Sequence, residues 1–304
     1  MNCTQVVKFI LMGFTDNPEL QLTLFAVFLA VYLATLLVNL GIMVLIRSNP
    51  QLHSPMYYFL GNLALVDLLY STVVTPKVLA DLVTERPLSY AGCVTQILMF
   101  SVFIITDCFL LATMAYDRYV AICHPLRYSV LMSPRLCVQL VSGSYLLGLV
   151  NGVGQTIGML NLTFCGSVVV NQFFCDISLL ISLSSSDGTI TSRILTAAAL
   201  LFGVSSSLVV LVSYIAIIST ILSIHPGEGQ HKAFSTCASH LAVVSIFYGN
   251  ALFIYLKPRS SRSREEDKWV AVFYTMVTPM LNPVIYSLRN QEVKEALRRL
   301  RARK

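Results

Sequence analysis

Charged side chains are scarce in this chain. Asp, Glu, Lys and Arg make up 12% of the 304 residues, whereas hydrophobic residues make up 56%. Soluble domains carry about 25% charged residues. The shortage therefore excludes an ordinary soluble domain and indicates a membrane protein.

Other features are missing as well. No internal repeat and no low-complexity linker divides the sequence, which favours one domain over residues 1–304. The five histidines show no metal-ligand spacing and no nucleophile lies with them, so we expect no enzyme, metal site or cofactor. The first residues lack an uninterrupted apolar core with a cleavage site, so we predict no removed signal peptide.

Long apolar stretches are what the sequence does contain. About 20 residues suffice for a helix to cross a bilayer, and residues 22–46 hold no charge. Backbone polar groups in lipid must be satisfied inside the segment, which requires helices. We predict an all-α membrane protein, a seven-transmembrane helix bundle, with spans near 22–46, 56–80, 94–116, 136–160, 194–222, 233–256 and 269–288.

The placement of basic residues predicts the orientation. An extracellular N-terminus puts most of them on the cytoplasmic side, with seven basic and two acidic residues in the tail 289–304. That balance suits anionic membrane lipid better than nucleic acid. The tail also predicts a short amphipathic helix, with an apolar side and a basic side formed by Val293, Leu297, Leu300, Lys294, Arg298, Arg299 and Arg301.

Two sequons, at Asn2 and Asn161, fall outside the membrane in this orientation, so both are candidate glycosylation sites. Stable disulfides form only on that side, where Cys3, Cys93, Cys165 and Cys175 lie. We expect the remaining cysteines to be free. Cys93, at the head of span three, is placed to tie down the loop 161–193, but spacing alone does not select its partner.

Two acids interrupt the apolar spans. Asp67 and Asp107 each cost roughly 2.5–3.5 kcal/mol at a helix centre on insertion scales, so they should face the bundle interior or water. Two explanations are compatible with the sequence: a hydrated polar cluster that joins helices, or a site that binds a cation or proton.

In span seven, Pro283 removes a backbone donor and predicts a kink, beside Asn282.

An adjacent acid and base, Asp117 and Arg118, stand at the inner end of span three before Tyr119. Taken alone, they fit an Arg that reaches the interface with an incidental acid beside it. However, "PMYYFLGNLALVD", "MAYDRYVAICHPLRY", "KAFSTCASHL" and "PMLNPVIYSLRN" occur in this order at the ends of spans two, three, six and seven. With these motifs the chain resembles the olfactory receptors, a branch of the rhodopsin-like G-protein-coupled receptors.

The resemblance implies an odorant receptor in the plasma membrane that activates a stimulatory heterotrimeric G protein and raises cAMP. It implies that Arg118 is held by its neighbouring acid until activation, and that Tyr214 and Tyr286 swing inward. It further implies a Cys93–Cys175 disulfide. The implied switch set is Asp117, Arg118, Tyr119, Tyr214, Asn282, Pro283 and Tyr286, and the implied buried polar site is Asp67, Asp107 and Asn282.

Aligning the motifs also implies a mainly apolar ligand pocket with a few hydroxyl groups, suited to a small volatile molecule. The expected lining is Phe100, Ser101, Ile104, Ile105, Cys108, Ala198, Phe202, Tyr248, Ala251 and Tyr255. Amine receptors of the superfamily carry an acid at the position of Phe100, so anchoring of a cationic amine there is not expected.

Three departures from the family pattern bear on structure. Asp107 stands where many members have Glu, and Val38 replaces the usual Gly before Asn39. Ser185 aligns with a common third loop cysteine, so Cys165 lacks its customary partner, and Cys3 is an alternative.

The rival function is an ion-coupled transporter or channel using Asp67 and Asp107, which predicts paired inverted halves that the sequence does not show.

Overall fold

Helices make up most of the structure, a computed structural model that describes residues 8–15, 17–84, 86–165, 168–223, 228–256, 264–289, 293–296 and 298. Within the helices, the side chains at 228, 229, 231–233, 235, 236, 239, 251–256, 264, 265 and 287–289 are not among those described. The amphipathic tail helix is helical at 293–296, and Leu297, Leu300, Arg299 and Arg301 lie outside the described residues.

Six helical stretches of the described chain are long and apolar enough to cross a membrane. Four are single helices: α1 (Pro18–Ser48), α2 (Pro55–Val83), α3 (Tyr90–Cys123) and α5 (Pro134–Leu160). The fifth joins α7 (Thr189–Ala198), the π-helical turn η3 (Ala199–Val204) and α8 (Ser205–Ser223). The sixth joins α10 (Arg264–Val272), the π-helical turn η5 (Phe273–Val277) and α11 (Thr278–Arg289). A further helix, α9 (Glu228–Leu256), completes the seven-helix bundle, which confirms the predicted fold class.

Helix starts follow local capping chemistry. The Asn17 side chain accepts a hydrogen bond from the backbone N–H of Glu19 at 3.0 Å, with Pro18 in the first turn. Ser89 caps α3 in the same way through the N–H of Gly92, also at 3.0 Å. Such side chains satisfy donors that have no partner inside a helix, and proline at the first position forfeits no bond. These caps fix where each long helix begins.

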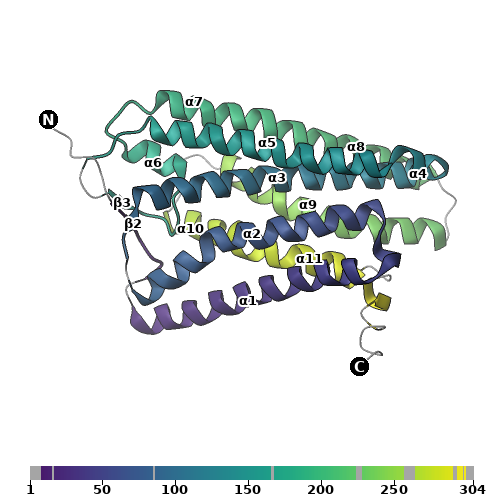
Figure 1. Cartoon of the computed structure of the whole chain (residues 1–304), viewed down its shortest axis with the longest axis horizontal. Helices are drawn as coiled ribbons and strands as arrows, with labels where there is room; N and C mark the ends of the chain where they lie inside the picture. The colour runs from purple at the N-terminus through teal and green to yellow at the C-terminus, as the bar shows by residue number, and fades with distance from the viewer. Residues whose placement is uncertain are drawn as a thin grey trace.

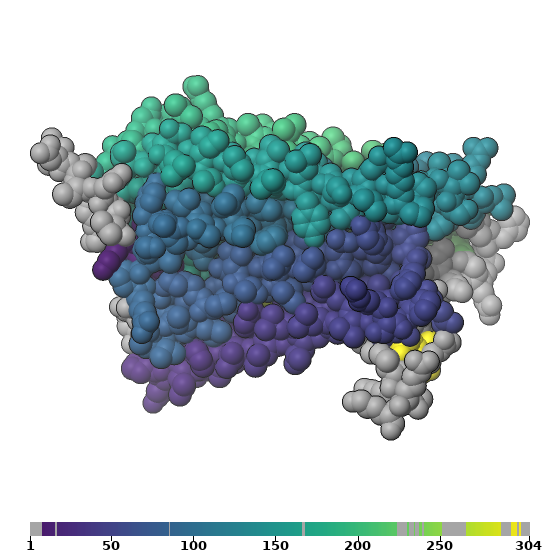
Figure 2. Space-filling view, in the orientation of Figure 1, coloured from purple at the N-terminus to yellow at the C-terminus, as the bar shows by residue number. Residues whose placement is uncertain are grey.

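The long helices run side by side along the molecule, with α3 packed against α2, α5 and α8 (Figure 1). In the space-filling view, α1, α2, α3 and α5 form successive bands across one face (Figure 2). The short helix α6 (Ile177–Leu183) and the strands lie at one end, which we call the outer end, and α4 (Tyr128–Leu131) lies at the opposite, cytoplasmic end (Figure 1). Short 3-10 turns, η1 (Pro50–Leu52) and η2 (Pro125–Arg127), also connect the long helices.

Glycines allow α5 to approach α3 closely. A Cβ atom on Gly148 would lie 2.5 Å from the carbonyl oxygen of Val102, and one on Gly152 would lie 2.5 Å from Val102 Cγ2. Both distances are shorter than van der Waals contact. The Gly148-x-x-x-Gly152 spacing puts both glycines on one helix face, the usual device for close packing of membrane helices.

A small sheet covers the outer end, in the order β2-β1-β3. Strand β1 (Lys8–Leu11) pairs antiparallel with β2 (Leu88–Ser89) and parallel with β3 (Val168–Val170), with Phe9 opposite both Leu88 and Val168. Phe9 is fully buried, and its ring packs edge-on against that of Phe164 at 5.3 Å. The start of the described chain is thereby fixed between two loops that follow other spans.

Candidate functional site

A cavity of about 550 Å³ opens inside the outer half of the bundle, between α3, α5, α7, α9 and α11. That volume falls within the 300–1,000 Å³ typical of small-molecule pockets. Its wall is mostly apolar, with aromatic rings from Phe100, Phe174 and Phe247. The residues that line it along α3 run from Ile97 to Cys108, which is about 16 Å at 1.5 Å per residue.

Most of the side chains predicted to line a pocket do so. Those on the cavity wall are Phe100, Ser101, Ile104, Ile105, Cys108 and Ala198. Phe202 and Tyr248 do not line the cavity, whereas their neighbours Gly203 and Phe247 do. The side chains of Ala251 and Tyr255 lie outside those the structure describes.

Several polar residues on the wall were not expected from the sequence. Asn151 and Gln155 come from α5, and the Asn151 side chain donates to the carbonyl of Ser101 at 2.9 Å. Asn250 comes from α9 and Tyr70 from α2. A signal for the two α5 residues existed: an Asn and a Gln one turn apart in an apolar span are expensive in lipid and so indicate an inward face.

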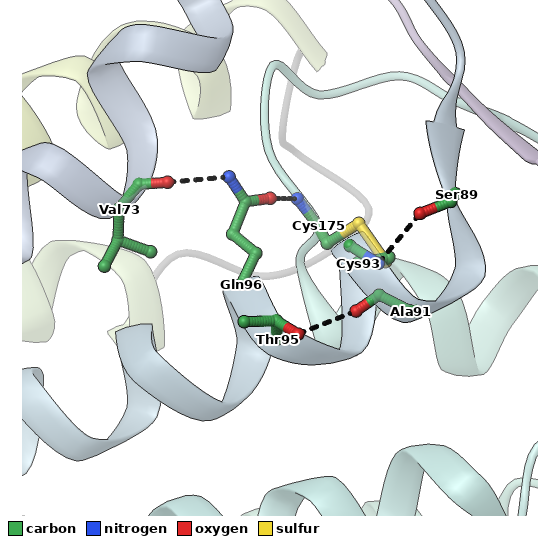
Figure 3. Close-up of a disulfide and its surroundings, with 8 residues drawn as sticks. Val73, Ser89, Ala91, Cys93, Thr95, Gln96 and Cys175 are labelled. Carbon is green, nitrogen blue, oxygen red and sulfur yellow. Dashed lines mark hydrogen bonds between the residues drawn. A yellow bond between two sulfur atoms is a disulfide. The ribbon is translucent and has the colours of Figure 1, made fainter.

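The loop after α5 forms the cavity roof, and Gln96 of α3 holds it in place (Figure 3). The Gln96 side chain donates to the carbonyl of Val73 on α2 at 3.1 Å and accepts from the backbone N–H of Cys175 at 2.8 Å. Beside it, Phe174 stacks on Phe100 with ring centroids 5.3 Å apart. One buried amide therefore connects two helices and the roof.

The Cys93–Cys175 disulfide is present, with Cα atoms 5.6 Å apart, and it ties the roof to the head of α3 (Figure 3). This agrees with the pairing that the family resemblance implied. Cys165 is also disulfide-bonded, and Cys3, its alternative partner, lies outside the described residues. The cysteines expected to be free are free: Cys108, Cys123, Cys137 and Cys237.

Hydrogen bonds replace the loop disulfide that Ser185 precludes. The backbone N–H of Ser185 donates to the carbonyl of Thr163 at 2.8 Å, and the N–H of Thr163 donates to the Ser186 hydroxyl at 3.0 Å. Close by, Thr189 donates to Asp187, and these bonds hold the pKa of that exposed carboxyl below its usual value. The loop thus remains connected at both ends without a second bridge to this segment.

Below the cavity lies the polar cluster that the intramembrane acids indicated. The side chain of Asn282 donates to both carboxylate oxygens of Asp67, at 3.1 and 3.0 Å. Asn39 donates to the carbonyl of Pro279, which also lines the cavity. Asp107, the other intramembrane acid, lines the cavity from α3. The α11 helix continues through Pro283.

At the cytoplasmic end, the acid of the Asp117-Arg118 pair has a different partner. The hydroxyl of Tyr128 donates to Asp117 at 2.8 Å, and burial together with this carboxylate raises the pKa of Tyr128, so it keeps its proton. The guanidinium of Arg118 contacts the sulfur of Met56. Lys77 and Asp81 on α2 form an ion pair, whereas Asp117 and Arg118 do not form one with each other here.

Two tyrosines of the predicted switch, Tyr214 and Tyr286, lie beside one histidine, His240. The hydroxyl of Tyr214 and Nδ1 of His240 are 2.6 Å apart, and the rings of His240 and Tyr286 are 6.1 Å apart. The Tyr119 hydroxyl pairs instead with His124 at 3.2 Å. Sequence reasoning missed His240, although it lies inside the quoted stretch "KAFSTCASHL".

Two further expectations concern modification and metal binding. Asn161 is exposed just after α5, so its amide is accessible from outside the bundle, and Asn2 lies outside the described residues. Glycosylation at either residue stays a prediction. Across the parts of the chain that are described, no group of three His, Cys, Asp or Glu side chains is placed to hold a metal ion.

Comparison with known proteins identifies the family. A family model described as "Olfactory receptor" matches residues 28–304. The chain is 52% identical to the mouse protein Olfactory receptor 5AP2, over 98% of this chain and 95% of that one. It is 49% identical to the human Olfactory receptor 8U9, over 99% and 97%, and 51% identical to the chicken Olfactory receptor-like protein COR4, over 98% and 96%. The chain therefore belongs to the olfactory receptor family, and it is a multi-pass plasma-membrane receptor.

Proposed function

We propose that this odorant receptor binds small, mostly apolar volatile molecules in the 550 Å³ cavity and activates a stimulatory, olfactory-type heterotrimeric G protein, which raises cAMP. The observation that carries the proposal is the position of the cavity. Its wall includes residues of α9 and α11, and the same two helices carry His240 and Tyr286 at the cytoplasmic end. Residues that contact the ligand and residues of the switch therefore lie on the same two helices, α9 and α11.

We expect a ligand to activate the receptor by shifting the equilibrium between its inactive and active conformations. A ligand moves that equilibrium only if it binds the active arrangement better than the inactive one. Contacts with Phe247 and Asn250 on α9 supply such a difference if α9 moves on activation. At the other end, Asp117 is held by Tyr128, which leaves Arg118 available for a G protein.

The alternative function, an ion-coupled transporter or channel, rested on Asp67 and Asp107. In the structure, Asp67 is bound by Asn282 on α11 beneath the cavity. This contact supports a role in holding α2 to the switch helix rather than in lining an ion path. Membership of the olfactory receptor family supports the receptor function as well.

The test is a cAMP assay on cells that express the receptor, using a broad panel of volatile compounds. We expect agonists, and we expect Arg118→Ala to abolish their response while the receptor stays on the cell surface. Arg47→Ala is the matched control, because Arg47 is exposed at the end of α1. A normal dose response from Arg118→Ala, or an equal loss in the control, contradicts the proposed coupling role.

A further inference from the structure

The side chain of Gln155 on α5 lines the cavity and ends in a buried amide. Gln155 is 5% exposed, and its oxygen Oε1 forms no hydrogen bond with any described group. A buried polar atom without a partner is costly, and a ligand that supplies the missing bond recovers that cost on binding. A polar group of the ligand that reaches this amide therefore gains affinity.

The helix that carries Gln155 is held in place on both sides of it. Three residues earlier, a Cβ atom on Gly152 would lie 2.5 Å from Val102 Cγ2 on α3, so the two helices are in close contact. Three residues later, the carbonyl of Gly158 accepts a hydrogen bond from the Thr191 hydroxyl on α7 at 2.8 Å. The amide of Gln155 is therefore presented from a rigid part of the wall, as a specific binding group requires.

Contacts between α3 and α5 show how deep Gln155 lies. The Asn151 side chain bonds the carbonyl of Ser101, and Gly148, earlier on α5, faces Thr106, later on α3. The two helices thus run in opposite directions. Gln155 comes four residues after Asn151, so it lies about 6 Å nearer the outer end of the cavity than Ser101 does.

The chemistry of an amide decides which ligand groups suit this position. Its oxygen accepts hydrogen bonds and its nitrogen donates them, and rotation about the last side-chain bond directs either atom to the cavity. A hydroxyl or carbonyl group therefore bonds to Gln155, whereas a hydrocarbon does not. A carboxylate finds no opposite charge, because the described residues of the wall include Asp107 and Asp176 but no Lys, Arg or His. An ammonium would exchange its hydration for an uncharged partner at Gln155.

We propose, building on the proposed function, that Gln155 determines the ligand class: its amide hydrogen-bonds the oxygen of a neutral alcohol, aldehyde or ketone at the outer end of the cavity. The hydrocarbon part of the ligand then extends inward along Ile104 and Ile105 of α3. Because an amide does not ionise, this preference depends on no protonation state of Gln155.

The first measurement is binding, followed as the rise in melting temperature of purified receptor in detergent when a compound is added. One series shares a chain of eight carbons: 1-octanol, octanal, 2-octanone, octane, octylamine and octanoic acid. A second has an aromatic body: 2-phenylethanol, phenylacetaldehyde, ethylbenzene, 2-phenylethylamine and phenylacetic acid. In the series that binds, the neutral oxygenated compounds should reach half of their maximal effect at concentrations up to about tenfold lower than the hydrocarbon, the amine or the acid.

The decisive variant is Gln155→Leu, which removes the amide. We expect the concentration needed for the oxygenated compounds to rise by up to about tenfold, and that for the hydrocarbon to stay equal or fall. Gln155→Met, which keeps an unbranched side chain and has only a weakly accepting sulfur, should behave in the same way and separates the hydrogen bond from packing. Gln139→Leu is the matched control, because Gln139 is exposed on the same helix. The ratio between two compounds within one variant cancels a general loss of stability.

The cAMP assay on the same compounds separates this inference from the proposed function. Oxygenated compounds that bind through Gln155 but raise no cAMP contradict the proposed function and leave the role of Gln155 standing. A cAMP response led by hydrocarbons, amines or acids overturns the ligand class and leaves the proposed function intact. An unchanged ratio in both Gln155 variants, or an equal change in Gln139→Leu, overturns the role of Gln155. No binding and no response in either series contradict both.

Discussion

Gly148 offers the most direct test of how the cavity wall is held. Gly148→Ala places a Cβ atom 2.5 Å from the carbonyl oxygen of Val102 and against the Thr106 hydroxyl. The carbonyl belongs to the backbone of α3, so it cannot rotate away, and one of the two helices must shift. Overpacking of this kind costs typically 1–3 kcal/mol of unfolding free energy.

The same helix supplies a control. A Cβ atom on Gly143 meets nothing within 4 Å, so Gly143→Ala changes only the helix propensity. Alanine in place of glycine inside a helix is favourable by roughly 0.5–1 kcal/mol. The two variants carry the same chemical change on α5, and we expect opposite signs: a lower melting temperature for Gly148→Ala and an equal or higher one for Gly143→Ala.

The assay uses the protein's own cysteines. Cys108, Cys137 and Cys237 are free and buried, so a thiol-reactive dye reports unfolding of purified receptor in detergent. Because Asn151 lies between Gly148 and Gly152 on α5, we also expect reduced agonist potency from Gly148→Ala. Equal melting temperatures for wild type and Gly148→Ala, or a matching decrease in Gly143→Ala, would refute the close-packing argument.

Two further predictions concern hydrogen bonds. Tyr128→Phe removes the hydroxyl that donates to Asp117, so Asp117 is free to pair with Arg118 and the maximal cAMP response should fall. Tyr58→Phe, on the exposed side of α2, is the control, and an unchanged maximum in Tyr128→Phe contradicts the idea that Tyr128 and Arg118 compete for Asp117. Gln96→Leu removes two hydrogen bonds worth about 0.5–1.5 kcal/mol each and leaves the Cys175 N–H buried without a partner, so the melting temperature and agonist potency should both drop. Thr95→Val, one residue away, should change neither, and equal behaviour of the two variants would rule out that Gln96 holds the roof to α2 and α3.

The bundle was predictable because bilayer thickness sets a simple length rule. Residues 22–46 have to form a helix in lipid whatever surrounds them, and α1 contains them all. The Cys93–Cys175 pair followed from the family resemblance rather than from spacing. Contacts between segments far apart in the chain, such as Gln96 with Val73 and Cys175, depend on where a loop folds back, and no periodicity records that.

The shift from Phe202 to Gly203 on the cavity wall has a specific physical origin. Both residues lie in η3, where the backbone adopts a π-helical turn rather than the regular 3.6-residue repeat. One extra residue in a turn rotates the following side chains by about 100° around the axis. Alignment of motifs assumes a regular helix there, so the predicted face differed from the observed one by one residue.

The order of the outer sheet constrains how the receptor is made. Strand β1 leaves the ribosome first, yet its parallel partner β3 follows four membrane crossings later, so the sheet cannot close until most of the bundle has been inserted. Contacts this distant in sequence form late in folding. Chains that stall before β3 is made would leave the β3-facing edge of β1 unpaired in the lumen of the endoplasmic reticulum, where an exposed strand edge is available to chaperones.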